Sequence, residues 1–156
     1  MSPDDGTPGG TIWTRGRRLG IDVGAVRVGV AMCDPDGILA TPVETVPRGA
    51  AEDAGEPAVR RIAELVTEHD VVGVVLGLPR NLRGEDGPAA RAAREFADAL
   101  TAGLDVPVEL VDERMTTVVA ARQLSGRGVK GRKQRAVVDQ AAAVQILQGW
   151  LDRARS

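Results

Sequence analysis

Hydrophobic periodicity along the chain predicts short strands followed by alternating helices and strands. In RRLGIDVG (residues 17–24), apolar residues alternate with small or polar ones, as in a half-buried strand. The run VVGVVLGL (71–78) is almost continuously apolar, which is typical of a parallel strand covered on both faces. In PAVRRIAELVTEHD (57–70), the apolar residues instead recur at helical spacing.

The other segments complete the order of elements βββαβαβαα. Further strands are predicted at 26–34, 38–46 and 106–113, and further helices at 88–100, at 116–124 and from 135 onward. Three successive strands favour an antiparallel meander, whereas strands that alternate with helices favour parallel pairing. The sequence therefore predicts an α/β fold with a five-stranded mixed sheet, helices on both faces, and a single domain over residues 18–156.

Composition narrows the classes of protein that remain. Aromatic residues make up 2% of the chain, with no tyrosine, so the core must consist of Val, Leu, Ile and Ala, and no aromatic platform for stacking bases is expected. The first 17 residues are rich in Gly, Pro, Asp and Thr, which predicts a disordered N-terminal tail. No apolar run is long enough to suggest a membrane span or a signal peptide.

A single cysteine limits the metal and redox chemistry. Cys33 has no partner for an intrachain disulfide, and no Cys/His cluster that could bind zinc is present. We therefore expect no zinc and a reducing, cytoplasmic environment. Cys33 lies in a predicted strand of Val, Ala and Met residues and is expected to be a small core residue.

Charge is distributed unevenly along the chain. The net charge is −2, yet residues 114–138 contain seven basic side chains and no acidic one, which leaves 13 basic and 22 acidic residues elsewhere. This pattern indicates an acidic body with one basic segment that can contact phosphates. A solvated loop is the alternative interpretation.

The last helix contains a carboxylate in an unexpected position. In RAVVDQAAAVQIL (135–147), helical spacing places Asp139 on the same side as Ala143, Ile146 and Leu147. A carboxylate among core residues is costly unless something compensates its charge.

Asp22 lies in a similar setting on the first strand. It shares a strand face with Gly20 and Gly24, so we expect open space beside it that admits a metal ion and a phosphate. The alternative is that the glycines serve the hairpin and Asp22 caps a backbone turn.

Two further acids end the last predicted strand, VELVDER. Asp112 and Glu113 point to opposite faces, and ligand sites gather at the carboxyl ends of parallel strands. The strand pattern does not choose between them, and an ordinary surface ion pair with Arg114 is the alternative.

Convergence of these acids would require a cation, because carboxylates repel one another. Oxygen ligands without His or Cys select Mg²⁺ or Mn²⁺. Two such ions about 4 Å apart form a site that cleaves phosphodiester bonds. Under this hypothesis, a metal cation compensates the charge of the Asp139 carboxylate.

Four segments now carry a resemblance to a known family. GIDVGAVRVGVAM, VVGVVLGLPRNLRG, VDERMTT and VVDQAAAVQIL occur in the order expected of the YqgF/RuvX family, and the chain resembles it over residues 18–152. Members have the ribonuclease-H-like fold and are regarded as candidate Holliday junction resolvases or pre-16S rRNA nucleases. The resemblance implies that Asp22, Glu113 and Asp139 are the catalytic, metal-binding acids, with Asp112 kept in reserve.

The resulting hypothesis is a metal-dependent endonuclease of ribosome biogenesis that processes the 5′ end of pre-16S rRNA. Asp22 would bridge two ions, and Glu113 and Asp139 would complete their coordination. Junction resolution in DNA recombination and repair is the alternative, for which a homodimer would be expected. The predicted contacts to structured RNA or branched DNA come from the loop after the fourth strand and the basic segment: Arg80, Asn81, Arg83, Arg127, Lys130, Arg132, Lys133 and Arg135.

Two other classes of protein remain open at this stage. Sugar kinases and actin-like ATPases share this topology and an Asp-x-Gly strand, but GRGVKGRK (126–133) lacks the Lys-Ser/Thr pair of a P-loop, so no nucleotide is expected. A non-catalytic nucleic-acid or ribosome-assembly binder is the second. A binder gains nothing from three anions held beside phosphate.

Overall fold

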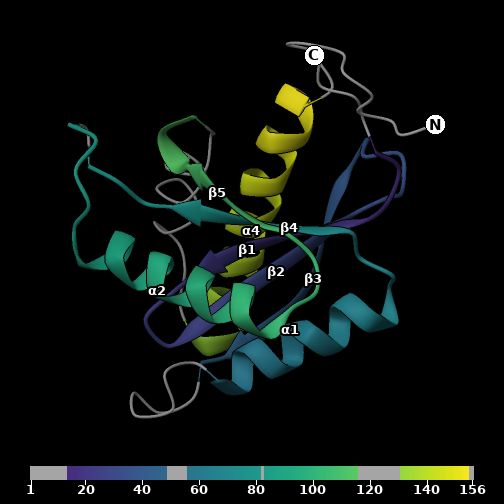
Figure 1. The fold of residues 1–156 in the computed structure, drawn as a ribbon. Helices are drawn as coiled ribbons and strands as arrows, with labels where there is room; N and C mark the ends of the chain where they lie inside the picture. The colour runs from purple at the N-terminus through teal and green to yellow at the C-terminus, as the bar shows by residue number, and fades with distance from the viewer. Residues whose placement is uncertain (1–13, 49–55, 82, 116–130, 155–156) are drawn as a thin grey trace.

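The computed structural model describes residues 14–48, 56–81, 83–115 and 131–154, with backbone alone at residues 56 and 131–139 (Figure 1). Five strands form one sheet in the order β3-β2-β1-β4-β5. The strands are β1 (Arg18–Val23), β2 (Arg27–Cys33), β3 (Ala40–Pro47), β4 (Gly73–Leu78) and β5 (Val108–Asp112). Most of the predicted tail, residues 1–13, lies outside the described residues.

The pairing of the strands is as predicted. β1 pairs antiparallel with β2, and β2 with β3, which forms the meander. β1 also pairs in parallel with β4, and β4 with β5, so the second half of the sheet is parallel. The carboxyl ends of β1, β4 and β5 therefore meet at one edge of the sheet.

Helices cover both faces of this sheet. The helices α1 (Glu56–Glu68) and α2 (Pro88–Gly103) lie on one face and α4 (Gly131–Ala154) on the other, while the short 3-10 turn η2 (Glu113–Met115) follows β5 (Figure 1). The predicted helix at 116–124 lies outside the described residues. Within the described chain, no helix combines the length and apolar character that a bilayer crossing requires.

The last helix begins four residues earlier than predicted. It starts at Gly131 rather than at residue 135, so the positions of Arg132, Lys133 and Arg135 are helical. The basic segment had suggested a Gly-rich loop. Residues 132–136, which follow Gly131 directly, are good helix formers, and the helix extends back to that glycine.

Two apolar clusters fill the space on either side of the sheet. The first lies under α1 and α2 and includes Leu19, Ile21 and Phe96. The second lies under α4 and includes Ile146, Leu147 and other residues, among them Cys33, which is 2% exposed. The prediction that Cys33 is a core residue is confirmed, and burial raises the pKa of its thiol.

The third strand begins later than the sequence suggested. Ile38 and Leu39 were predicted to be part of it, but both are exposed, and their backbone N–H groups donate to Asp34 Oδ1 at 2.9 and 2.8 Å. These hydrogen bonds keep residues 38 and 39 in the turn, so β3 starts only at Ala40. Pro42 is tolerated in β3 because the strand lies at the sheet edge.

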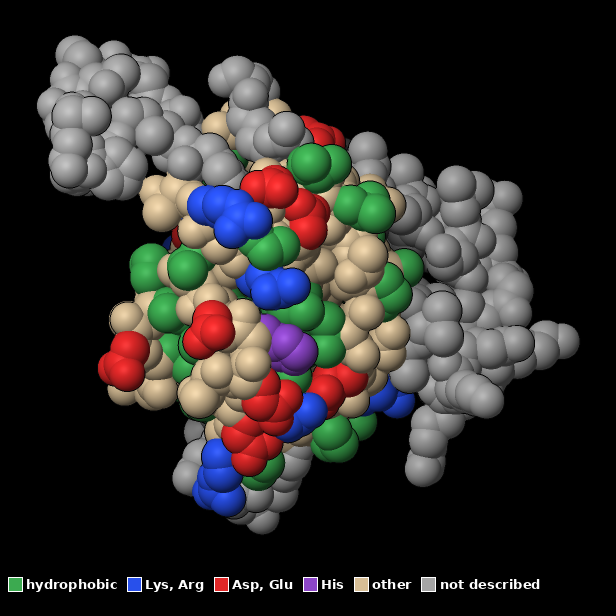
Figure 2. Space-filling view, turned by 90° about the vertical axis from the view of Figure 1, so that its right-hand side faces the viewer, with side chains coloured by type: hydrophobic (Ala, Val, Ile, Leu, Met, Phe, Trp, Pro, Cys, Tyr) green, Lys and Arg blue, Asp and Glu red, His purple; other side chains and the backbone are tan. Residues whose placement is uncertain are grey.

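One side of the molecule, which faces right in Figure 1 and is drawn in Figure 2, carries mixed charge. Acidic and basic side chains are interspersed on it. Over the described part of that face, basic side chains do not form a continuous patch. We therefore look for a phosphate-contact surface on the side that faces left in Figure 1.

Close packing of α4 on the sheet depends on two glycines. A Cβ atom at Gly20 would lie 2.6 Å from Leu147 Cβ and 2.7 Å from the Ala143 carbonyl oxygen. A Cβ atom at Gly77 would lie 2.5 Å from Ile146 Cδ1. The missing side chains therefore let the helix approach to a distance that no other residue permits.

The volume over the two glycines that flank Asp22 on its strand face is occupied, whereas the sequence analysis expected it to be open. Leu147 and Ala143 occupy the volume over Gly20, and at Gly24 a Cβ atom would lie 2.8 Å from the Arg27 carbonyl oxygen of the hairpin. Gly20 allows the close packing of α4, and Gly24 allows the close turn of the hairpin. The space beside an inward-facing glycine is occupied by the segment that packs against it.

We predict that Gly20→Ala destabilises the fold by about 1–3 kcal/mol, since the added methyl group overpacks the α4 interface. Urea unfolding measures the change in the free energy of unfolding. Gly73→Ala, in β4, is the matched control because its added Cβ would be no closer than 3.6 Å to Arg18 Cγ. Equal effects of the two substitutions would contradict the close packing.

Candidate active site

Two carboxylates are buried at the carboxyl ends of the parallel strands. Asp22, at the end of β1, is 5% exposed, and Glu113, just after β5, is 3% exposed. Among the described side chains, these two are the only charged ones that are buried. Both therefore lie where ligand sites gather in a parallel sheet, outside the carboxyl ends of its strands.

The register of the sheet brings the two carboxylates to the same face. The β1–β4 ladder pairs Ile21 with Leu76, so Asp22 lies beside the next residue, Gly77. Glu113 reaches back over this glycine, and its Oε2 is 2.8 Å from the Cβ position of Gly77. Adjacent strands are about 4.8 Å apart, which places the Glu113 carboxylate about one strand away from Asp22.

The backbone of Asp139 lies at the same level of the sheet. Its neighbour Gln140 donates from Nε2 to Thr45 Oγ1 at 3.0 Å. Thr45 pairs with Gly29, and Gly29 pairs with Asp22, so these residues form one row across the sheet. The side chain of Asp139 lies outside the described residues, and its convergence with the other two acids stays a prediction.

The donor atoms of this site suit a hard cation. No group of three His, Cys, Asp or Glu side chains that could hold a metal ion occurs among those the structure describes, a set that excludes Asp139. The two described members, Asp22 and Glu113, offer carboxylate oxygens, which are the ligands that Mg²⁺ and Mn²⁺ prefer.

Asp112 has different partners from Glu113. Arg114 holds it through Nε and Nη2, at 3.0 and 2.6 Å from Oδ2, and Arg80 Nη1 lies 3.7 Å from the same atom. The hydrogen bonds from Arg114 lower the pKa of Asp112, and the charge of Arg80 lowers it further. Asp112, the reserve ligand in the sequence analysis, is thus engaged by two arginines.

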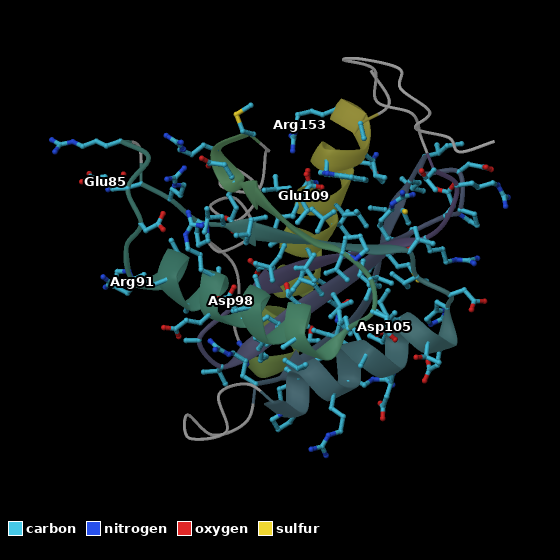
Figure 3. All side chains as sticks on the ribbon, viewed as in Figure 1. Glu85, Arg91, Asp98, Asp105, Glu109 and Arg153 are labelled. Atoms are coloured by element: carbon cyan, nitrogen blue, oxygen red, sulfur yellow. The ribbon has the colours of Figure 1, made fainter. Side chains whose placement is uncertain are left out.

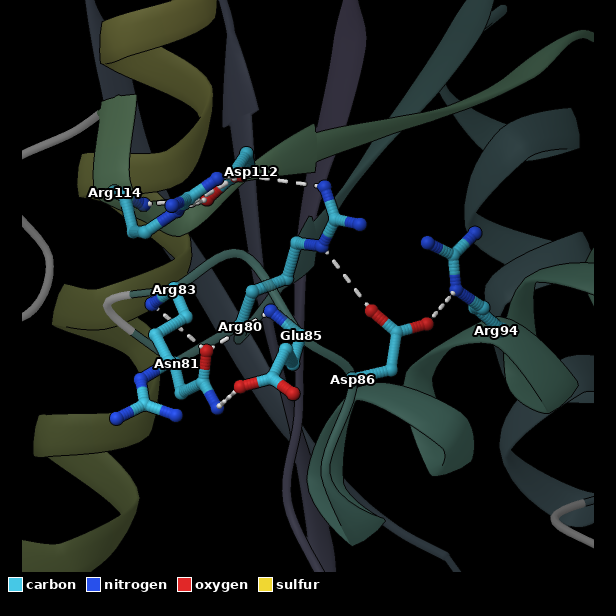
Figure 4. Close-up of polar contacts among 8 residues, drawn as sticks. All are labelled: Arg80, Asn81, Arg83, Glu85, Asp86, Arg94, Asp112 and Arg114. Carbon is cyan, nitrogen blue, oxygen red and sulfur yellow. Dashed lines mark hydrogen bonds and ion pairs between the residues drawn. The ribbon is translucent and has the colours of Figure 1, made fainter.

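A chain of ion pairs extends from Asp112 to α2 (Figure 4). Arg80 Nε donates to Asp86 Oδ1 at 3.1 Å, and Arg94 Nε donates to the other oxygen of the same carboxylate. Arg94, and to a lesser degree Arg80, lower the pKa of Asp86. Two carboxylates and three guanidinium groups therefore tie the loop after β4 to β5 and to α2.

Asn81 has an internal structural role in this loop. Its Oδ1 accepts hydrogen bonds from the backbone N–H groups of Arg83 and Glu85, both at 2.9 Å, and its Nδ2 donates to Glu85 Oε1 at 3.2 Å. Gly84, at φ +80°, lies within 3.6 Å of the Arg114 guanidinium when given a Cβ atom. The loop is thereby folded against the turn that carries Glu113.

The exposed arginine of the loop points away from this network. The guanidinium of Arg83 extends away from Arg80 and Asp86 in Figure 4, and the residue is exposed. Glu85 and Arg91 extend from the same end of the molecule (Figure 3). Of the other predicted nucleic-acid contacts, Arg127 and Lys130 lie outside the described residues, and the side chains of Arg132, Lys133 and Arg135 do as well.

The sequence analysis missed Gly77 and the Asp86–Arg94 pair. A glycine inside an apolar parallel strand is the signal that could have identified the close approach at Gly77. The pairing of Asp86 with Arg94 had no comparable signal, because it joins a loop to a helix whose relative position depends on the tertiary structure.

Comparison with known sequences connects the chain to one family. A family profile described as "RuvX: Holliday junction resolvase" matches residues 16–153. A protein of Rhodococcus jostii (strain RHA1), provisionally named a pre-16S rRNA nuclease, is 60% identical over 144 residues, which cover 91% of this chain and 81% of the relative. A protein of Nocardia farcinica with the same name is 60% identical over 153 residues, with 96% and 83% covered.

Solved structures show the same fold. RuvC of T. thermophilus in complex with a Holliday junction substrate aligns with a TM-score of 0.58 at 16% identity, covering 90% of this chain and 96% of RuvC. The yeast mitochondrial Holliday junction resolvase Ydc2 aligns with a TM-score of 0.55 at 10% identity, covering 92% and 80%. The chain has the predicted ribonuclease-H-like fold, and at these identities the likeness concerns fold alone.

We predict that Arg114→Gln raises the pKa of Asp112 toward its ordinary value of 3.8, because it removes the guanidinium hydrogen bonds that lower it most, while the backbone N–H of residue 114 still donates to Asp112. Since the pKa is lower in the folded state, the ion pair stabilises the fold above the unfolded pKa, and this contribution is lost as pH falls through the folded value. Carboxyl ¹³C NMR titration measures the pKa, and urea unfolding at several pH values measures the stability. Asp86, held by Arg94, serves as the internal control and should keep its lowered pKa. An unchanged Asp112 midpoint would refute the assignment.

Proposed function

This chain belongs to the RuvX family, and we propose that it is a nuclease that hydrolyses phosphodiester bonds in structured nucleic acid. The observation that carries the proposal is the burial of Asp22 and Glu113 on one face of the sheet, at the carboxyl ends of parallel strands. Two buried anions side by side serve no packing purpose, whereas a divalent cation compensates both charges.

Asp22, Glu113 and Asp139 are the residues that would hold Mg²⁺ or Mn²⁺. When bound, the metal supplies an activated water molecule and charge stabilisation at the leaving oxygen. The fold itself buries two of these carboxylates on one face of the sheet. Gly77 leaves the room that the Glu113 carboxylate needs to reach across β4 toward Asp22.

The basic residues that were predicted to contact nucleic acid, and whose backbone the structure describes, divide into two groups. Arg80 is committed to Asp86 and Asp112, so its charge is largely compensated within the protein. Arg83 is exposed and directed outward, and the basic positions Arg132, Lys133 and Arg135 occupy the first turns of α4. We therefore assign phosphate contacts to Arg83 and to the start of α4, and a bracing role to Arg80.

Precursor 16S rRNA is the proposed substrate, processed at its 5′ end in the cytoplasm. Two relatives at 60% identity are provisionally named as nucleases of this RNA, and they cover most of this chain. A Holliday junction is the alternative, favoured by the description attached to the family profile. Junction resolution would require two copies of the chain, because two strands must be cut.

We predict that Asp22→Asn, Glu113→Gln and Asp139→Asn each lower the cleavage rate by about 100-fold or more while nucleic-acid binding is retained, since each removes a metal ligand and an anion. Single-turnover cleavage and gel-shift binding measure the two effects. Asp105→Asn, an exposed carboxylate on the far side of the molecule (Figure 3), is the control and should behave as the unsubstituted protein.

The substrate is tested by offering the purified protein precursor 16S rRNA and a four-way DNA junction, each with Mg²⁺, Mn²⁺ or Ca²⁺. Cleavage of the RNA alone, with Mg²⁺ or Mn²⁺, supports the proposed substrate. Preferential, symmetric cleavage of the junction would assign the alternative. Binding without cleavage of either, under every metal, would identify a non-catalytic binder, and tight ATP binding would identify a nucleotide-binding protein.

We predict that Arg83→Gln weakens nucleic-acid binding and reduces the slope of log K against log salt by about 1, because one phosphate contact is lost. Fluorescence anisotropy at several salt concentrations measures the slope. Arg15→Gln is the control, because Arg15 is exposed and paired with Asp36 at 2.9 Å, in the turn between β2 and β3. An equal slope in all three proteins would argue that Arg83 makes no phosphate contact.

A further inference from the structure

Glu113 occupies a position where the strand ladder no longer holds the backbone. β5 ends at Asp112, and Glu113 is the first residue of the turn η2. A side chain just beyond a strand can adopt many directions, yet Glu113 is 3% exposed and its carboxylate lies over Gly77. The direction of the Glu113 side chain therefore depends on how the turn after β5 is held.

The side chain of Asp112 contacts Arg114, so the residue before Glu113 and the residue after it are held together. Its Oδ1 accepts a hydrogen bond from the backbone N–H of Arg114 at 2.9 Å, which closes a side-chain-to-backbone turn around Glu113. The guanidinium of Arg114 then returns to the same carboxylate, with Nη2 2.6 Å from Oδ2. The Asp112 carboxylate thus links the first residue of this side-chain-to-backbone turn to the residue that follows Glu113.

This turn is also anchored to the rest of the molecule. Arg80 bridges Asp112 and Asp86, and Arg94 of α2 holds the other oxygen of Asp86 (Figure 4). The side chain of Asp112 is 19% exposed, so these contacts are shielded from solvent more than those of a typical surface pair.

Asp112 itself lies on the opposite face of the strand from Glu113. Leu110, two residues before Asp112, packs in the cluster under α1 and α2, whereas the Glu113 carboxylate lies over Gly77, against which Ile146 of α4 packs. The arginines that hold Asp112 come from the loop after β4 and from η2. Asp112 can therefore influence Glu113 only through the backbone that they share.

We propose that Asp112 is a positioning residue that directs the Glu113 carboxylate over Gly77 and toward Asp22, and thereby sets the metal affinity of the site. The inference rests on the proposed function. Asp112→Ala removes both the turn hydrogen bond and the pairing with the arginines. Asp112→Asn keeps an oxygen that can accept the Arg114 N–H but weakens the pairing.

The experiment measures Mn²⁺ binding to the full chain by calorimetry and by electron paramagnetic resonance, alongside thermal unfolding. Asp112→Ala should bind Mn²⁺ about tenfold more weakly, as is typical when a residue that orients a ligand is lost. Asp112→Asn should recover part of that loss. In cleavage assays kcat should fall with KM for nucleic acid unchanged.

Glu44→Gln is the matched control. Glu44 is a half-buried carboxylate paired with Arg61 through two bonds of 2.8 and 2.9 Å, between β3 and α1. Its substitution removes a similar ion pair, and we expect it to change thermal stability without changing Mn²⁺ affinity. A merely structural role for Asp112 would give the same result as this control.

The outcomes separate this inference from the proposed function. Lost Mn²⁺ binding in Glu113→Gln but unchanged binding in Asp112→Ala would overturn the positioning role alone. Absence of Mn²⁺ binding in the unsubstituted protein would count against the metal-dependent function and, with it, this inference. Where Asp112→Ala does not fold, Asp112→Asn decides: weaker Mn²⁺ binding at unchanged thermal stability supports the role, and unchanged binding overturns it.

Discussion

The contact between α4 and two glycines in neighbouring strands determines where buried charge can exist in this protein. Because Gly20 and Gly77 have no side chains, α4 packs close to the sheet and covers the face on which Asp22 and Glu113 are buried. A buried face has a low effective dielectric constant, so carboxylates there interact strongly with one another and with a bound cation. The chemistry proposed for the site therefore depends on a packing distance.

The sheet also separates two kinds of carboxylate. Asp22 and Glu113 are buried on the face that α4 covers and are the proposed metal ligands, whereas Asp112 and Asp86 lie among arginines that compensate their charge within the protein. Asp112 and Glu113 are adjacent in sequence but have different surroundings, because Asp112 ends β5 among arginines whereas Glu113 begins η2 and its carboxylate lies over Gly77. One strand end thus supplies both a candidate ligand and the residue that orients it.

Much of the architecture could be predicted from the chain alone because it depends on local periodicity. Alternation identified β1, the continuous apolar run identified β4 as a buried parallel strand, and helical spacing identified the buried side of α4, where Ala143, Ile146 and Leu147 are buried. Less of the site could be predicted. The glycines beside Asp22 suggested open space, but packing fills the volume over them. Nothing in the sequence indicated that Asn81 holds its own loop through hydrogen bonds to the backbone, and its predicted phosphate contact stays a prediction.

The sequence by itself determined the order of the elements, the faces of the strands and the presence of acids at strand ends, since each of these follows from residues close together in the chain. Only the tertiary structure decided that Glu113, and not Asp112, reaches over Gly77, and that Arg80 braces a turn more than 30 residues away in sequence. Such choices depend on distances between segments, and those distances are set by the packing of the helices and strands against one another rather than by any local pattern.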